Sequence, residues 1–255
     1  MSDFGVRFNT AAGYRQIDTK HIVPQLIGRF DMANYSYVDV TEELGAQPGW
    51  IMRLYDFQAP ASILSRKYMM FHSIPSGGQE VYSDGFKVMY KHGASFSAPV
   101  LYFFALDFVT KSGASWGIRV MRPDGSVTYD SGNGHLNLSY IYSGRSVNVD
   151  HDDTAHASMG IVTSIGAPAK GMPSAPAICP PFFTRVTSFG RRLQGTGEDT
   201  CSLFYRSYGG SLQAVMLRTE YRYTNDEVPD NSFSNFYVSK ATNLTIFLID
   251  RSIYD

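Results

Sequence analysis

Residues 116–131, WGIRVMRPDGSVTYDS, decide the fold class. Ile118 and Val120 alternate with Arg119 and Met121, and Val127 and Tyr129 alternate with Thr128 and Asp130. A period of two residues is typical of strands. Between these runs stands Arg122-Pro123-Asp124-Gly125. Proline presets φ for the second position of a type I turn, aspartate suits the third, and glycine tolerates a positive φ at the fourth. The stretch therefore predicts a β-hairpin.

A related pattern lies near the start of the chain, in residues 4–19. Its positions match those of 116–131 at a constant spacing and without a gap, which indicates an internal repeat. The matching pairs are Phe4 with Trp116, Gly5 with Gly117, Val6 with Ile118, Arg7 with Arg119, Gly13 with Gly125, Ile17 with Tyr129, Asp18 with Asp130 and Thr19 with Ser131.

The composition and the repeat together predict an all-β protein. Tyrosine and phenylalanine are abundant, at 17 each, and 23 glycines and 12 prolines interrupt the short apolar runs. We expect two tandem β-sandwich-like domains related by duplication. Residues 1–112 would open with the hairpin 4–19, and residues 113–255 with the hairpin 116–131. The second domain would carry loop insertions near 150–180 and 190–235. Whether the two units share a sheet is left open.

Charge and apolar runs narrow the range of partners. The formal net charge is −1, which argues against a nucleic-acid binder that relies on overall positive charge. Since no run of about 18 apolar residues occurs, we expect no membrane span. The N-terminus lacks the pattern of a secretion signal, so we expect synthesis in a cytoplasm, with Cys179 and Cys201 as free thiols.

The sequence presents no catalytic or metal-binding motif above background. His151-Asp152-Asp153-Thr154-Ala155-His156 holds potential metal ligands, but a solvated acidic loop is the better interpretation because no distant third ligand is identifiable. Arg191-Arg192 could meet an anion, although paired surface arginines are common. We therefore predict a protein that is not an enzyme and that uses no cofactor and no metal. A site assembled from distant residues stays open.

The tyrosines of the second half admit two interpretations. They could form a contact surface for sugars or for a partner protein, because tyrosine combines apolar area with a polar tip. They could equally pack on the sheet or in the core, which we favour. The residues concerned are Tyr205, Tyr208, Tyr221, Tyr223 and Tyr237.

Charged residues recur at equivalent places in the two hairpins. Arg7 and Arg119 could pair with Asp18 and Asp130 across the ladder, or these aspartates could accept hydrogen bonds from backbone N–H groups at the turns. Both interpretations are structural. The residues assigned to hairpin and turn geometry are Gly5, Gly13, Asp18, Gly117, Pro123, Asp124, Gly125 and Asp130.

The two hairpins, 5–19 and 117–131, resemble a motif of tailed-bacteriophage structural proteins of the distal tail, at the tip or the fibre attachment. The resemblance implies a non-enzymatic, β-rich, oligomeric virion component, made in the host cytoplasm and assembling with copies of itself or with other tail proteins. Contact would come from aromatic burial and strand-edge pairing. The alternatives are a carbohydrate- or receptor-binding module of a virion, meeting a host glycan or receptor, and a polysaccharide hydrolase.

Overall fold

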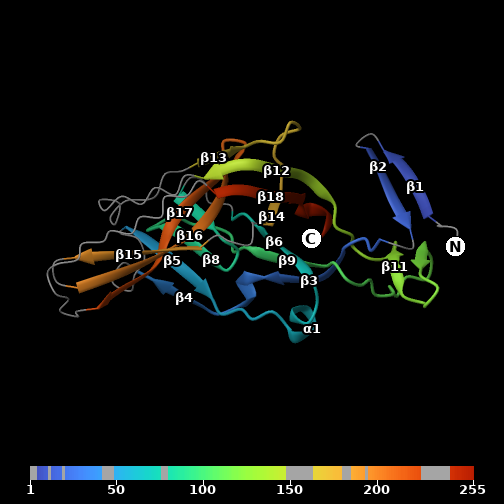
Figure 1. Ribbon diagram of the computed structural model, residues 1–255, viewed down its shortest axis with the longest axis horizontal. Helices are drawn as coiled ribbons and strands as arrows, with labels where there is room; N and C mark the ends of the chain where they lie inside the picture. Colours follow the sequence, from blue (N-terminus) through green and yellow to red (C-terminus); the bar gives the residue numbers. More distant parts are fainter. Residues whose placement is uncertain are drawn as a thin grey trace.

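The chain forms antiparallel strands almost throughout the part that the computed structural model describes, which is residues 5–10, 13–18, 21–41, 49–75, 80–147, 163–179, 185–192, 195–224 and 242–255. Two large sheets face each other, and two separate hairpins lie at one end of the molecule (Figure 1). The short helices described are η1 (Met32–Asn34), α1 (Ala61–Leu64) and η5 (Arg251–Ile253). The all-β prediction is confirmed.

One large sheet has six strands. In spatial order they are β12 (Leu138–Val147), β18 (Thr242–Asp250), β14 (Pro176–Cys179), β6 (Tyr68–Ser73), β9 (Val100–Ala105) and β3 (Gln25–Asp31). All of its ladders are antiparallel. Register shifts interrupt the ladders of both outer strands, β12 and β3.

The other large sheet has eight strands. Seven follow the order β13 (Thr163–Gly166), β17 (Ser211–Thr224), β16 (Gly195–Tyr208), β7 (Val81–Ser83), β8 (Lys87–Lys91), β5 (Trp50–Tyr55) and β4 (Tyr37–Val40). The eighth, β15 (Arg185–Arg192), pairs with β16. Both outer strands of the path, β13 and β4, are only four residues long.

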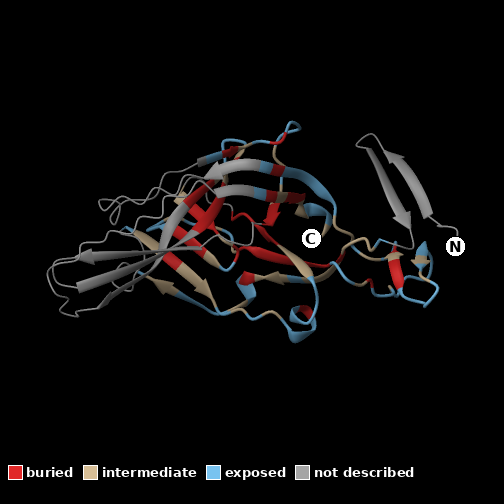
Figure 2. Ribbon diagram, viewed as in Figure 1, coloured by how far each residue is buried: buried red, intermediate tan, exposed pale blue. Residues whose placement is uncertain are grey.

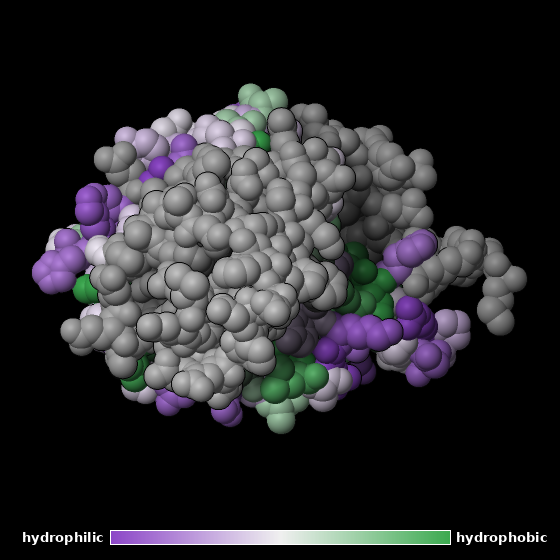
Figure 3. Space-filling model, turned by 60° about the vertical axis from the view of Figure 1, so that its left-hand side comes forward, coloured by the Kyte–Doolittle hydropathy of each residue, from purple (hydrophilic) through white to green (hydrophobic). Residues whose placement is uncertain are grey.

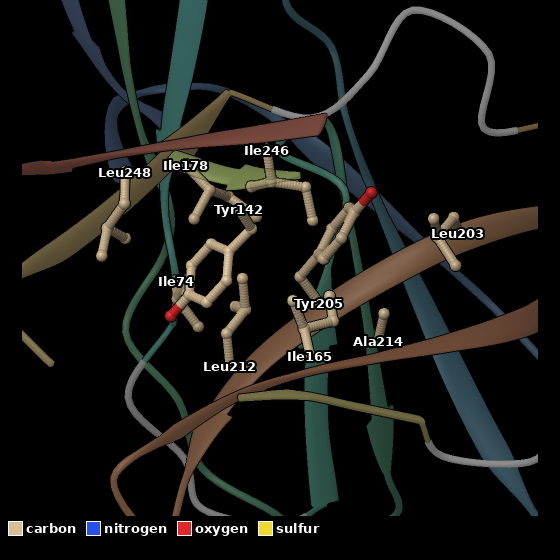
Figure 4. Packing of buried hydrophobic residues seen from close by; sticks show 10 residues of the cluster. All are labelled: Ile74, Tyr142, Ile165, Ile178, Leu203, Tyr205, Leu212, Ala214, Ile246 and Leu248. Carbon is tan, nitrogen blue, oxygen red and sulfur yellow. The ribbon is translucent and has the colours of Figure 1, made fainter. Parts of the chain in front are cut away.

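The main core lies between the two sheets. Tyr142, Ile178 and Ile246 come from the six-stranded sheet, and Leu203 and Tyr205 come from the eight-stranded sheet. Figure 4 shows the two tyrosine rings pointing into the same space, with the aliphatic side chains around them. Burying each such side chain contributes roughly 1.5–3 kcal/mol, so this cluster holds the two layers together.

Strand β9 is buried along its whole length, as the sequence VLYFFA predicts. Leu101 and Phe103 pack with Ile63 of α1, while Phe104 lies on the opposite face and packs with Phe71 of the neighbouring β6. Figure 2 shows this buried band running through the middle of the molecule. A strand with no polar face has to be covered on both sides, and here it is.

The domain boundary expected near residue 112 does not separate the sheets. β14 from the second half pairs with β6 from the first, and β16 pairs with β7 through Tyr205 and Ser83. The two halves therefore share both large sheets instead of forming tandem sandwiches. The strand β6 pairs with β9 on one edge and with β14 on the other, so the second half of the chain pairs the backbone groups that β6 would otherwise leave open.

The loop insertions expected near 150–180 and 190–235 are partly wrong. The first range contains β13 and β14, and the second contains β16, which is 14 residues long. The strand β17 in the second range agrees with the strand that the sequence predicts from Leu212 to Tyr223. Threonine and tyrosine recur in β16, and their preference for strands outweighs the glycines at its start that suggested a loop.

Truncating the inter-sheet core is expected to destabilise the whole fold. Ile246 is fully buried between the sheets, whereas Ile253 is 58% exposed in η5. Ile246→Ala should lower the free energy of unfolding by about 2–5 kcal/mol because it leaves a cavity, and Ile253→Ala should change it by less than about 0.5 kcal/mol. Urea unfolding followed by circular dichroism measures both, and equal losses would contradict this placement of the core.

Candidate interaction surface

The second hairpin consists of β10 (Arg119–Met121) and β11 (Val127–Asp130), joined by a tight turn. The Gly125 N–H donates to the Arg122 carbonyl at 2.9 Å, and the Arg122 N–H donates to the Ser126 carbonyl at 2.8 Å. Gly125 has a φ of 83°, a value that suits glycine, and the ladder shifts register next to the turn. Asp124 accepts the Ser126 N–H at 2.8 Å.

Asp130 anchors the base of this hairpin. Its side chain is 4% exposed and accepts four hydrogen bonds: from the Ser112 N–H at 3.0 Å, the Ser112 hydroxyl at 2.7 Å, the Gly132 N–H at 2.9 Å and Arg119 Nε at 2.6 Å. The ion pair and the backbone contacts that the sequence offered as alternatives thus occur together. Burial alone would raise the pKa of the carboxyl, but these donors outweigh it and hold the pKa well below its usual value.

Gly117 sits where a side chain would collide with the hairpin. Its φ is 147°, and a Cβ built on it would lie 2.5 Å from Ser131 Oγ. That hydroxyl oxygen accepts the Ile118 N–H at 2.8 Å, and the Ser131 N–H donates to the Ile118 carbonyl at 2.9 Å. The close approach fixes the segment that leads into β10.

Three large apolar side chains of this segment face solvent. Trp116 is 88% exposed, Ile118 53% and Met121 47%, and we call them together the hairpin patch. Exposed apolar residues that gather in one place mark interaction sites more often than scattered ones do. Exposed apolar side chains also lie in β4, at Tyr37 and Val38, and in β12, at Leu138, Tyr140 and Ile141. On the face that Figure 3 draws, apolar groups lie beside hydrophilic ones.

The first hairpin, β1 (Gly5–Thr10) with β2 (Gly13–Asp18), lies beside the second, and β2 contacts β11 (Figure 1). Its register differs by two residues from that of its counterpart, because Gly5 faces Asp18 whereas Arg119 faces Asp130. Arg7 therefore lies opposite Gln16, and Asp18 lies opposite Gly5 and not opposite Arg7 as expected. The side chains of β1 and β2 lie outside the described residues.

The tyrosine surface expected from the sequence is not assembled as predicted. Tyr205 is fully buried between the sheets, because its position in β16 points inward in phase with Leu203. Tyr208 is 43% exposed at the end of β16. Tyr221 and Tyr223 lie in the part of β17 whose side chains are not described, and Tyr237 falls outside the described residues altogether.

Two buried polar side chains meet where the halves of the chain join. The rings of His72 and Tyr205 lie 6.2 Å apart, and within the described residues His72 Nε2 and the Tyr205 hydroxyl have no hydrogen-bond partner. His72 faces Ile178 of β14, and Tyr205 faces Ser83 of β7. Burial lowers the pKa of His72 to about 4, and the contact with the Ser73 carbonyl offsets this only in part.

A second polar cluster ties the outer strand β4 to β5. Arg53 makes a two-pronged ion pair with Asp39, with both N–O distances at 2.8 Å, and its guanidinium carbon lies 3.7 Å from the Tyr37 ring centroid. The Tyr90 hydroxyl donates to Asp39 at 3.1 Å. The hydrogen bond from Arg53 lowers the pKa of Asp39. Since these groups satisfy one another, the cluster stabilises the sheet edge.

The described residues contain no group of three or more His, Cys, Asp or Glu side chains placed to hold a metal ion. Residues 151–156 lie outside that part of the chain, and Arg191-Arg192 end β15. Cys179 is a buried thiol, and burial raises its pKa to about 11; the side chain of Cys201 is not described. No described helix has the length and apolarity needed to cross a membrane.

No protein-family model, no curated protein and no solved structure matches this chain. The assignment of function therefore depends on the residues themselves. The sequence indicated the hairpin and its aspartate, but it missed Ser112 as a partner of Asp130 and missed the exposure of Trp116. A tryptophan between serine and glycine, just before a short strand, is the signal that could have pointed to the hairpin patch.

Replacing Asp130 should loosen the second hairpin. Asp130→Asn removes the charge that accepts hydrogen bonds from Arg119, Ser112 and Gly132. We expect the free energy of unfolding to fall by about 2 kcal/mol. Hydrogen exchange at the Ser112 and Gly132 amides should accelerate. Asp124→Asn is the matched control, since Asp124 is exposed and bonds only within the turn, and it should leave those two amides protected. Unchanged exchange in Asp130→Asn would refute the anchoring role.

His72 should make the fold sensitive to acid. The pKa of His72 in the folded protein, about 4, lies below that of an unfolded histidine, about 6.5. Between these two pH values the unfolded chain binds a proton at this residue and the folded chain does not, so lowering the pH favours unfolding. Stability should fall across that window by up to about 3 kcal/mol. Urea midpoints measured between pH 7 and pH 4 should fall less steeply for His72→Leu than for the wild type, while Met70→Leu on the same strand should keep the wild-type slope. Parallel slopes for all three proteins would contradict this.

Proposed function

We propose that this protein is a non-enzymatic structural component of a phage tail, at the distal tip or the fibre attachment, which assembles with other protein chains. The hairpin patch carries the proposal. Trp116, Ile118 and Met121 expose apolar area on a hairpin that Asp130 and Gly117 hold in place. Rigid, exposed aromatic and methionine side chains are the kind that contribute most to protein interfaces.

The resemblance of the two hairpins to tail structural proteins supports the same proposal. Both hairpins lie at one end of the molecule, where a partner could reach them (Figure 1). That end is distinct from the two large sheets, which bury their own core. A division between a self-sufficient sandwich and a projecting contact region suits a protein that is held by its neighbours in a particle. Side-chain burial on the patch would supply most of the affinity.

The proposal is tested by deleting the encoding gene in the virus that carries it. Electron microscopy should then show particles without a complete tail tip or without fibres, and supplying the wild-type chain should restore them. Mass spectrometry of purified wild-type particles should find the chain as a constant constituent. Complete, infectious particles without the chain would refute the proposal.

A further inference from the structure

Away from the hairpins, β4 and β5 bring four side chains to one face of the eight-stranded sheet, at its outer edge. In their antiparallel ladder Tyr37 lies opposite Tyr55, and Asp39 lies opposite Arg53. Residues opposite each other, and residues two apart on one strand, share a face of the sheet. Within the described residues no strand lies beyond β4. We call these four residues the edge site.

Tyr37 presents an aromatic ring that is held on one side and open on the other. The guanidinium carbon of Arg53 lies 3.7 Å from the centroid of this ring, and the Tyr55 ring meets it in a T-shaped contact with the centroids 6.1 Å apart. Tyr37 is nevertheless 50% exposed, so solvent reaches the ring face that is turned away from Arg53. A ring that its neighbours already hold loses little conformational entropy when a flat ligand stacks on it.

The ion pair that stabilises this edge leaves part of its hydrogen-bonding capacity unused. The bonds to Asp39 and Tyr90 employ only Nε and Nη2 of Arg53, so the N–H groups of Nη1 can donate to a ligand. The Asp39 side chain is 34% exposed, and a carboxylate can accept about four hydrogen bonds. Burial raises the pKa of Tyr55, and the positive charge of Arg53 opposes that rise, which indicates that the Tyr55 hydroxyl lies near the guanidinium.

We infer that the edge site binds a neutral saccharide, with one sugar ring stacked on Tyr37 and its hydroxyl groups bonded to Arg53, Asp39 and Tyr55. Sugar hydroxyls both donate and accept hydrogen bonds, and the C–H face of a pyranose is apolar, which matches a tyrosine ring surrounded by donors and acceptors. The charges of Arg53 and Asp39 cancel, so the site has no net charge to attract an ion. This inference goes beyond the proposed function and does not depend on it.

The small apolar area of the site favours a sugar over a protein partner. Val38 is 62% exposed but lies opposite Leu54, so it points to the other face of the sheet. On its own face, Tyr37 is the one large apolar side chain that β4 exposes. A tyrosine offers at most about 250 Å², whereas a stable protein interface buries roughly 800 Å² on each partner. One ring is enough for a single pyranose.

Titration of the whole chain with neutral trisaccharides tests this inference. Maltotriose, mannotriose and triacetylchitotriose are added to ¹⁵N-labelled protein, and the amide shifts of β4 and β5 are followed by NMR. We expect at least one of the three sugars to bind with a Kd between about 0.1 and 10 mM. Tyr37→Ala should weaken that binding at least about 10-fold, because it removes the stacking surface. Val38→Ala, on the opposite face of the same strand, is the matched control and should keep the wild-type Kd.

Tyr55→Phe separates a loss of binding from a loss of folding, since it keeps the ring and removes only the hydroxyl. It should weaken binding by about 3- to 10-fold, and it decides the matter if Tyr37→Ala does not fold. Sialyllactose tests the choice of a neutral ligand and should bind no more tightly than the neutral sugars. The inference is overturned if none of the three neutral sugars binds, if Tyr37→Ala and Val38→Ala lose affinity equally, or if sialyllactose alone binds. None of these results bears on whether the chain is a constituent of a tail.

Discussion

The fold depends on strand pairing between segments far apart in the chain. In the six-stranded sheet the two halves join where β14 meets β6, and in the eight-stranded sheet they join where β16 meets β7. Both junctions are short, so ladder hydrogen bonds contribute little there. Burial of Ile178 and Tyr205 between the sheets has to hold them instead. Both large sheets contain strands from each half of the chain, which explains why they form a single two-layered body.

Two buried side chains at these junctions have a polar atom without a hydrogen-bond partner among the described residues. His72 lies in the β6 ladder beside β14, and Tyr205 lies in the β16 ladder beside β7, with their rings 6.2 Å apart. An unpaired buried polar atom costs free energy that an apolar side chain would not. Gly85 makes the arrangement sterically feasible, since a Cβ there would approach the His72 ring to 2.9 Å. The junction is therefore closely packed, but its unpaired polar atoms lower the stability that the packing provides.

Local features of the fold could be predicted from the sequence because their causes are local. The Pro123-Asp124-Gly125 turn follows from allowed φ values, and the burial of β9 follows from six consecutive apolar residues. The order of the strands could not be predicted, since the pairing of β14 with β6 depends on contacts across about a hundred residues of sequence. The phase of β16, which turns Tyr205 inward, depends likewise on a distant pairing, that of β16 with β7. Asp130 shows the limit within one site: its cross-strand partner Arg119 was predictable, whereas Ser112 comes from a loop.

The outer strands of the two sheets are short or irregular, which bears on how the hairpin patch would contact a partner. An open strand edge can pair with any other strand, and proteins commonly protect edges with short or irregular strands. Here β4 and β13 have four residues each, and the ladders of β3, β12 and β13 contain register shifts. The ion pair between Arg53 of β5 and Asp39 of β4 also binds the outer strand to its neighbour. Unspecific pairing through the backbone is thus disfavoured at the edges formed by β3, β4, β12 and β13. A contact made by Trp116 and its neighbours depends on the shape of the partner and not on a free ladder, so it can be selective where an open edge could not.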